Sequence, residues 1–151
     1  MFLRLHIGTC KTGTTSIQKF LSDNKKELSK QGILYPDSMR AQENIYHNFF
    51  YLYGCDPNEL SRELVWYENV NSDRPSKLLS IELDKLNKEL KSSNAIKCII
   101  SNEQLSSNLQ TKQQIEKIKE ITDNLFDDVE IILYIRRPIE YFISNVSTQI
   151  L

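Results

Sequence analysis

Three short apolar segments, at residues 2–7, 95–101 and 129–135, are separated by stretches whose apolar residues recur with helical spacing. The second and third segments are nearly continuous apolar runs, which are typical of parallel strands buried on both faces. Strands that alternate with helices favour an α/β domain, because parallel neighbours must be joined by a crossover connection. A chain of 151 residues suits one such domain. We therefore expect residues 1–151 to form a three-layer α/β/α domain around a central parallel sheet.

Amphipathic patterns define the helices that we expect between and after these strands. One helix is predicted from Thr14 to Gly32, with Phe20 and Leu21 on its buried face. A short extended piece follows before Pro36. The other predicted helices are two short ones within 40–75, longer ones at 76–93 and 111–125, and a last one that begins near Pro138.

Composition and charge exclude several classes of protein. The net charge is −1, so no overall positive field attracts nucleic acid. No stretch approaches the roughly 20 apolar residues of a membrane span, and the first residues are too short and too polar for a secretory signal. Cys10, Cys55 and Cys98 lack the spacing of metal ligands and read as free thiols in a reducing compartment. These features predict a cytoplasmic protein without a nucleic-acid partner.

Residues 5–18 read LHIGTCKTGTTSIQ and hold two of the four glycines of the chain, Gly8 and Gly13. The phosphate-binding loop of nucleoside-triphosphate enzymes has the pattern G-x-x-x-x-G-K-[ST]. Gly8 and Gly13 keep that spacing, but Thr14 occupies the lysine position and the lysine of the loop is Lys11, three residues earlier. We expect a P-loop NTPase-like fold in which backbone amides and a helix N-terminus face an anion. The alternative is an ordinary strand-to-helix turn with threonine caps.

The two later strands also end in chemically useful side chains. Glu103 follows residues 95–101 and could take a proton from an alcohol, or cap a helix instead. Arg136 and Arg137 follow the last strand and could bind phosphate as bidentate donors, or pair with a nearby acid such as Glu140. Ligands of open parallel sheets bind beyond the carboxyl ends of the strands. We therefore expect these groups to meet the glycine loop at one edge of the sheet.

Two stretches carry a resemblance to a known family. KTGTTSIQ resembles the 5′-phosphosulfate-binding loop of the sulfotransferases that use 3′-phosphoadenosine-5′-phosphosulfate (PAPS). RRPIEYFIS resembles the 3′-phosphate segment of that family, R-x-P-x₅-S, with Arg136, Pro138 and Ser144 at the matching spacing. The resemblance covers residues 3–36 and 95–149, and one further strand lies between the two motifs, as in the family.

The resemblance implies a PAPS-dependent sulfotransferase that moves a sulfuryl group to a hydroxyl or amine of a small-molecule or carbohydrate acceptor, without a metal. Lys11 would stabilise charge on the leaving oxygen, and Glu103, at the position of a histidine in many relatives, would be the general base. His47 is the reserve base, whereas His6 lies in mid-strand and is expected to be a core residue. The implied donor-binding residues are Lys11, Thr12, Gly13, Thr14 and Thr15 for the 5′-phosphosulfate, and Arg136 and Ser144 for the 3′-phosphate.

The sequence also departs from the family. It stops at Leu151, whereas relatives continue into a segment that covers the adenine. We therefore expect a domain that lacks this C-terminal segment, and the apolar surface left uncovered predicts self-association. Two alternatives stay open: a P-loop kinase-like phosphotransferase, and a non-catalytic module of the same fold that binds a partner. The aromatic residues at 46–53 would suit a sugar or an aromatic alcohol as acceptor, and core packing explains them equally well.

Overall fold

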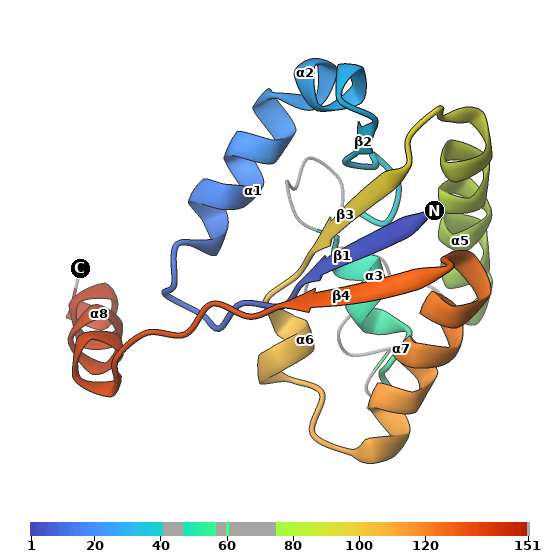
Figure 1. Cartoon of the computed structure of the whole chain (residues 1–151). Coiled ribbons are helices and arrows are strands. Elements are labelled where there is room, and N and C mark those ends of the chain that lie inside the picture. The colour runs from blue at the N-terminus through green and yellow to red at the C-terminus, as the bar shows by residue number, and fades with distance from the viewer. Residues whose placement is uncertain (41–46, 57–59, 61–74, 151) are drawn as a thin grey trace.

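The chain folds around a sheet of four parallel strands, which is flanked by helices (Figure 1). The computed structural model describes residues 1–40, 47–56, 60 and 75–150. Within these residues the strand order is β2-β3-β1-β4. The predicted α/β class with a parallel sheet is confirmed. The strands are β1 (Phe2–His6), β2 (Ile33–Leu34), β3 (Lys97–Ser101) and β4 (Asp128–Ile132).

Seven helices lie in the described part of the chain, and those predicted at 76–93, at 111–125 and from Pro138 are confirmed. Of the two short helices predicted within 40–75, one matches α3 and the rest of that prediction lies outside the described residues. None of the described helices is long and apolar enough to cross a membrane. The helices are α1 (Thr14–Asp23), α2 (Lys25–Lys30), α3 (Asn48–Leu52), α5 (Pro75–Ser92), α6 (Gln104–Ser107), α7 (Lys112–Leu125) and α8 (Pro138–Ile150).

β1 is the central strand from which the others are positioned. Leu3 lies beside Cys98 of β3 and beside Val129 of β4, in parallel register. Because successive residues of a strand point to opposite faces, Leu3 faces one way and Arg4 and His6 face the other. The two faces of the sheet therefore differ, one apolar and one polar along β1.

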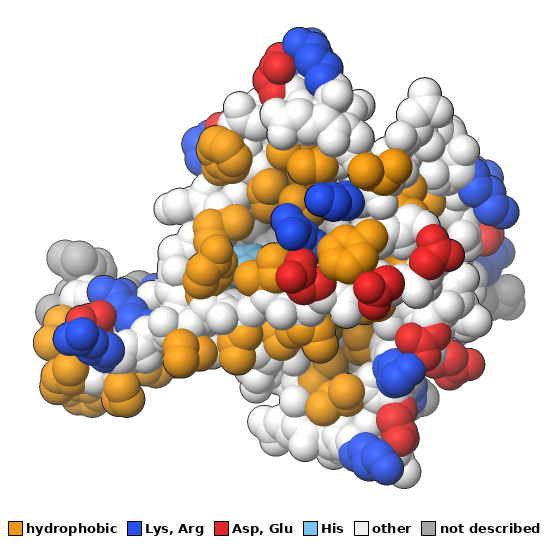
Figure 2. Space-filling view, viewed as in Figure 1, with side chains coloured by type: hydrophobic (Ala, Val, Ile, Leu, Met, Phe, Trp, Pro, Cys, Tyr) orange, Lys and Arg blue, Asp and Glu red, His pale blue; other side chains and the backbone are white. Residues whose placement is uncertain are grey.

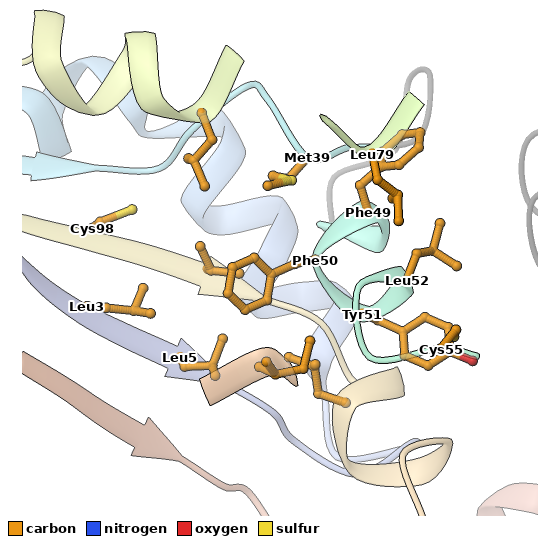
Figure 3. Close-up of a cluster of buried hydrophobic side chains, with 14 of the residues drawn as sticks. Leu3, Leu5, Met39, Phe49, Phe50, Tyr51, Leu52, Cys55, Leu79 and Cys98 are labelled. Atoms are coloured by element: carbon orange, nitrogen blue, oxygen red, sulfur yellow. The ribbon is translucent and has the colours of Figure 1, made fainter. Parts of the chain in front are cut away.

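The apolar face of the sheet carries the core (Figure 3). Leu3 of β1, Phe50 of α3 and Leu86 of α5 are at most 1% exposed, and Ile118 of α7 is also buried in this cluster. These three helices therefore cover one face of the sheet. On the opposite face α1 meets the sheet through Gln18. The layers are consistent with the three-layer arrangement that the sequence predicts.

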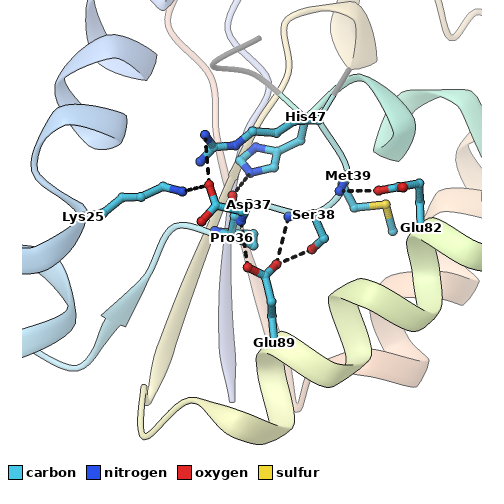
Figure 4. A network of polar contacts seen from close by, with 9 residues as sticks. Lys25, Pro36, Asp37, Ser38, Met39, His47, Glu82 and Glu89 are labelled. Carbon is cyan, nitrogen blue, oxygen red and sulfur yellow. Dashed lines mark hydrogen bonds and ion pairs between the residues drawn. The ribbon is translucent and has the colours of Figure 1, made fainter. Parts of the chain in front are cut away.

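Residues 37–39, which follow β2, are held by two glutamates of α5 (Figure 4). Glu89 accepts hydrogen bonds from the backbone amides of Asp37 and Ser38, each at 2.9 Å. Glu82 accepts one from the amide of Met39 at 3.2 Å. These bonds satisfy backbone donors that would otherwise be left without partners at the edge of the core.

The first predicted helix is two helices in the structure, because the chain bends at Asn24. The side-chain amide of Asn24 donates to the carbonyl of Phe20 at 2.8 Å, a local bond that competes with helix continuation. The predicted buried face is wrong at Phe20, which is 62% exposed. Leu21 is buried as predicted, and Thr14 and Gln18 are buried with it. Thr14 and Gln18 can be buried because each has a hydrogen-bond partner. Thr14 bonds to Glu103, just beyond β3, and Gln18 bonds to Ser101, within β3.

The prediction that residues 129–135 form a strand buried on both faces is also wrong. β4 lies at an edge of the sheet, where Ile131 is 61% exposed and Ile135, just beyond the strand, is 78% exposed. α8 stands apart from the sheet (Figure 1), and its Phe142 is 63% exposed. Apolar side chains accordingly gather on the surface of α8 (Figure 2). An apolar run predicts a strand, but its burial depends on what lies beside it.

Leu86→Ala should lower the free energy of unfolding by about 2–5 kcal/mol, because a fully buried leucine leaves a cavity when it is truncated. Ile81→Ala, on the same helix, is the matched control, since Ile81 is 43% exposed and its truncation should change stability by less than about 1 kcal/mol. Urea titration of both variants measures the difference. Equal losses would show that α5 does not pack as described.

Candidate functional site

The loop between β1 and α1 ends in a left-handed glycine at the start of the helix. Gly13, the residue before α1, has φ 85° and no side chain caps the helix. No acidic residue stands in the first turn of α1. The first backbone N–H groups of a helix lack partners within it and carry partial positive charge. The N-terminus of α1 therefore offers donors to an anion.

The loop is also tightly packed at Gly8. A Cβ atom at this position would lie 2.9 Å from Nε2 of His6, 3.0 Å from Cγ2 of Thr14 and 3.3 Å from Oγ1 of Thr12. Only glycine fits without displacing one of these neighbours. Gly8 thus permits the loop to pass directly over the buried side chain of His6.

The segment that leaves β4 runs beside this loop (Figure 1). The amide of Thr9 donates to the carbonyl of Tyr134 at 3.2 Å, which continues the pairing of β1 with β4. Beyond it, Nη1 of Arg136 donates to the carbonyl of Lys11 at 3.0 Å. Lys11 has φ 62°, a left-handed conformation that costs a non-glycine residue about 1 kcal/mol or more. The arginine therefore braces the loop where its backbone is least favourable.

Arg136 also forms the ion pair that the alternative interpretation predicts, with Glu140 at 3.6 Å. Both groups are well exposed, so the pair contributes little to stability. A ligand phosphate could therefore replace Glu140 at small cost. Ser144 lies further along α8, which stands apart from the sheet.

Glu103 follows β3 and reaches the start of α1. Its carboxylate accepts a short hydrogen bond from the hydroxyl of Thr14. Glu103 stands at the N-cap position of α6, but its side chain makes no capping bond to that helix. The capping alternative is therefore not what the structure contains. Instead, a half-buried carboxylate lies against the first residue of α1.

A buried chain of hydrogen-bonded polar side chains, which the sequence did not predict, lies beneath the loop. Nε2 of Gln18 donates to Oγ of Ser101 at 3.1 Å, and Oγ of Ser101 lies 2.8 Å from Nδ1 of His6. All three residues are at most 3% exposed. Burial lowers the pKa of His6, although the negative charge of Glu103 opposes this shift. A signal was present, since Gln18 lies one turn after Thr14 and about one turn before Leu21, on one face of the helix.

His47, the reserve base, is placed in the core rather than at this site (Figure 4). It is 0% exposed, its Nε2 donates to the carbonyl of Pro36 at 3.2 Å, and its Nδ1 accepts from the amide of Ser101 at 3.1 Å. Burial, assisted by the charge of Arg40, lowers the pKa of His47 to about 3. A neutral histidine with both ring nitrogens bonded has no free lone pair for an acceptor substrate.

A cavity of about 370 Å³ opens beside the loop. Its walls come from the loop, from α6, from the segment between β4 and α8 and from the first turn of α8, so it lies where the three strand ends meet. Burial and the charge of Glu103 raise the pKa of the Cys10 thiol, which is therefore protonated at neutral pH. The lining residues are Thr9, Cys10, Ser106, Ser107, Ile135, Arg136, Pro138 and Tyr141.

Four of the predicted site residues form two hydrogen-bonded pairs. Thr14 contacts Glu103, and Lys11 contacts Arg136 through its carbonyl. Thr15 is exposed at the start of α1, next to the buried Thr14. Among the described residues, no three histidine, cysteine, aspartate or glutamate side chains gather as metal ligands do.

No protein-family model matches the chain, and neither a curated protein nor a solved structure matches it. Function must therefore be inferred from the loop, the three strand ends and the cavity between them. These features form an edge of the sheet that offers backbone N–H donors, with one half-buried carboxylate close to it.

The burial of neutral His47 predicts a specific dependence of stability on pH. Below its ordinary pKa of 6.5, the unfolded chain takes up a proton at His47 that the folded protein does not accept. The free energy of unfolding should therefore fall as the pH drops from about 6.5 to 5, by at most about 1.4 kcal/mol per pH unit for this group. Denaturant titrations across that range measure the slope, and ordinary carboxylates stay ionised there.

His47→Asn keeps a hydrogen-bonding group near the Nδ1 position but cannot titrate, so its slope should be shallower than that of the wild type. His6 also has a lowered pKa and should supply the slope that remains. An unchanged slope in the variant would contradict the assignment of His47 as a buried neutral group.

Proposed function

We propose that this chain is a sulfotransferase-like domain that binds PAPS and transfers its sulfuryl group to a hydroxyl or amine. The observation that carries this proposal is the hydrogen bond from Arg136 to the carbonyl of Lys11, 3.0 Å long and 125 residues apart in sequence. It joins the two stretches that resemble the donor-binding motifs of that family. The glycine loop and the parallel sheet also support a P-loop-like fold for the domain.

The donor would bind along the carboxyl edge of the sheet. The amides at the start of α1, together with Thr12, Gly13 and the hydroxyl of the exposed Thr15, would hold the 5′-phosphate. Arg136 and Ser144 would hold the 3′-phosphate, with the guanidinium exchanging Glu140 for the ligand. Of these groups, Arg136 also lines the cavity beside the loop.

Lys11 and Glu103 would carry the chemistry. The acceptor oxygen or nitrogen forms a bond to sulfur while its proton passes to the Glu103 carboxylate. The bond between sulfur and the bridging oxygen breaks, and its electron pair stays on the 5′-phosphate, where the Lys11 ammonium stabilises the charge. Holding the two reactants in line would supply much of the acceleration, as in phosphoryl transfer.

The bond between Thr14 and Glu103 gives each residue a more specific part in this scheme. While the Thr14 hydroxyl donates to the carboxylate, it cannot donate to a phosphate. Thr14 would then orient the base, and the phosphate would take the backbone amides and Thr15. A carboxylate so close to an anion site also keeps the sulfuryl donor and the proton acceptor within reach of one substrate.

3′,5′-Adenosine diphosphate should raise the melting temperature of the protein by roughly 5–10 °C at about 100 times its dissociation constant. ATP with Mg²⁺ should have a much smaller effect, because the loop has no lysine at the position that clamps a γ-phosphate. Differential scanning fluorimetry makes the comparison. Equal or greater stabilisation by ATP with Mg²⁺ would favour the kinase-like alternative and refute this proposal.

Lys11→Ala should remove most of the stabilisation by 3′,5′-adenosine diphosphate, because it removes the only lysine of the loop. Lys26→Ala is the matched control, since Lys26 is exposed on α2. If both variants bound the ligand like the wild type, the non-catalytic alternative would be preferred.

Glu103→Gln should separate binding from catalysis. Removal of a negative charge near the anion site should leave the affinity for 3′,5′-adenosine diphosphate unchanged or increase it. Sulfuryl transfer to any acceptor that the wild type uses should fall by about 10²–10⁴-fold, the usual effect of losing a general base. Glu116→Gln, on the exposed side of α7, serves as the control. Weaker ligand binding in Glu103→Gln alone would indicate a structural role for this carboxylate.

A further inference from the structure

His6 carries a ring nitrogen whose environment the fold does not account for. The residue is 3% exposed, and its Nε2 has no hydrogen-bond partner among the described residues. Buried polar atoms in folded proteins nearly always have partners, since an unpaired one destabilises the fold. The other histidine, His47, follows this rule at both ring nitrogens.

The hydrogen bonds around His6 favour one position for its proton. The Gln18 amide donates to Oγ of Ser101, so the hydroxyl proton of Ser101 remains to be donated. The acceptor within reach is Nδ1 of His6, at 2.8 Å. An imidazole that accepts at Nδ1 and is neutral carries its proton on Nε2. The unpartnered atom is therefore an N–H donor.

This donor is directed at the inner side of the glycine loop. Nε2 lies 2.9 Å from the point that a Cβ on Gly8 would occupy, and the same point is 3.3 Å from Oγ1 of Thr12 and 3.0 Å from Cγ2 of Thr14. Thr14 is the first residue of α1, so the N–H lies close to the N-terminus of that helix, on the side of the loop that faces the sheet. A side chain at Gly8 would collide with Nε2 and block this approach.

We propose that Nε2–H of His6 donates a hydrogen bond to an oxygen of the anion that the loop binds, which makes His6 a ligand-binding residue. The inference rests on the proposed function only in that the loop must bind a sulfate- or phosphate-type group. Because Nε2 is closed to solvent, the contact forms when the loop shifts around Gly8 as the anion enters. His6 and the helix N-terminus then present donors to the same group from two directions.

The two histidines of the chain allow a direct test by NMR of protein labelled with ¹⁵N-histidine. The ring nitrogen shifts should show His6 with its proton on Nε2. Addition of sodium sulfate, and separately of 3′,5′-adenosine diphosphate, should move the Nε2 resonance of His6 and leave His47 unchanged as the internal reference. A proton on Nδ1 of His6, or an unmoved His6 resonance when either ligand is shown to bind, would overturn the proposal.

Two variants provide a matched comparison of affinity. His6→Asn keeps an amide near the Nδ1 position but loses the donor at Nε2, whereas His6→Gln places an amide near Nε2. Titration calorimetry should show affinity for 3′,5′-adenosine diphosphate reduced about tenfold or more in His6→Asn and less in His6→Gln. Equal affinities in both variants and the wild type would overturn the role of His6. The wild-type NMR titration decides the question if either variant fails to fold.

The outcomes also separate this inference from the proposed function. If sulfate moves the His6 resonance but 3′,5′-adenosine diphosphate does not stabilise the protein, His6 is an anion donor and the PAPS assignment fails. If 3′,5′-adenosine diphosphate stabilises the wild type while His6 stays unmoved, the PAPS assignment stands and the role of His6 fails.

Discussion

The backbone pairing of β1 with both of its neighbours is the constraint on which the site depends. β1 is bonded to β3 on one side and to β4 on the other, all in the same direction. The pairing extends past the strand ends, where the amide of Asn102 donates to His6 and the amide of Thr9 donates to Tyr134. This pairing places Glu103 and Arg136 on the two sides of the loop between β1 and α1, which is distant from both residues in sequence.

The sequence predicted the elements well because each has a local cause. Apolar runs, amphipathic stripes and a proline at the start of α8 depend on residues that are near one another in the chain. Burial has no such local cause, and the predictions for Phe20 and for residues 129–135 were wrong. Ile131 is exposed because it belongs to an edge strand, and Phe20 is exposed because Gln18 takes the inward face of α1.

The sequence likewise predicted part of the candidate site, namely which segments meet but not how their side chains bond. The carboxyl ends of parallel strands must meet, so the proximity of the loop, Glu103 and Arg136 followed from the fold class. The bonds among them did not follow. Ser101 links His6 with Gln18 across 95 and 83 residues of sequence, and periodicity carries no information on such pairs. His47 was equally ambiguous, because the same aromatic surroundings suit a substrate pocket or a core.

The bond between Arg136 and the carbonyl of Lys11 also has a consequence for the order of assembly. A contact between residues so far apart in sequence forms late in folding, because the entropy cost of closing a long loop must be overcome first. During synthesis Lys11 leaves the ribosome 125 residues before Arg136. The left-handed conformation at Lys11 is therefore unsupported by Arg136 until β4 has paired with β1.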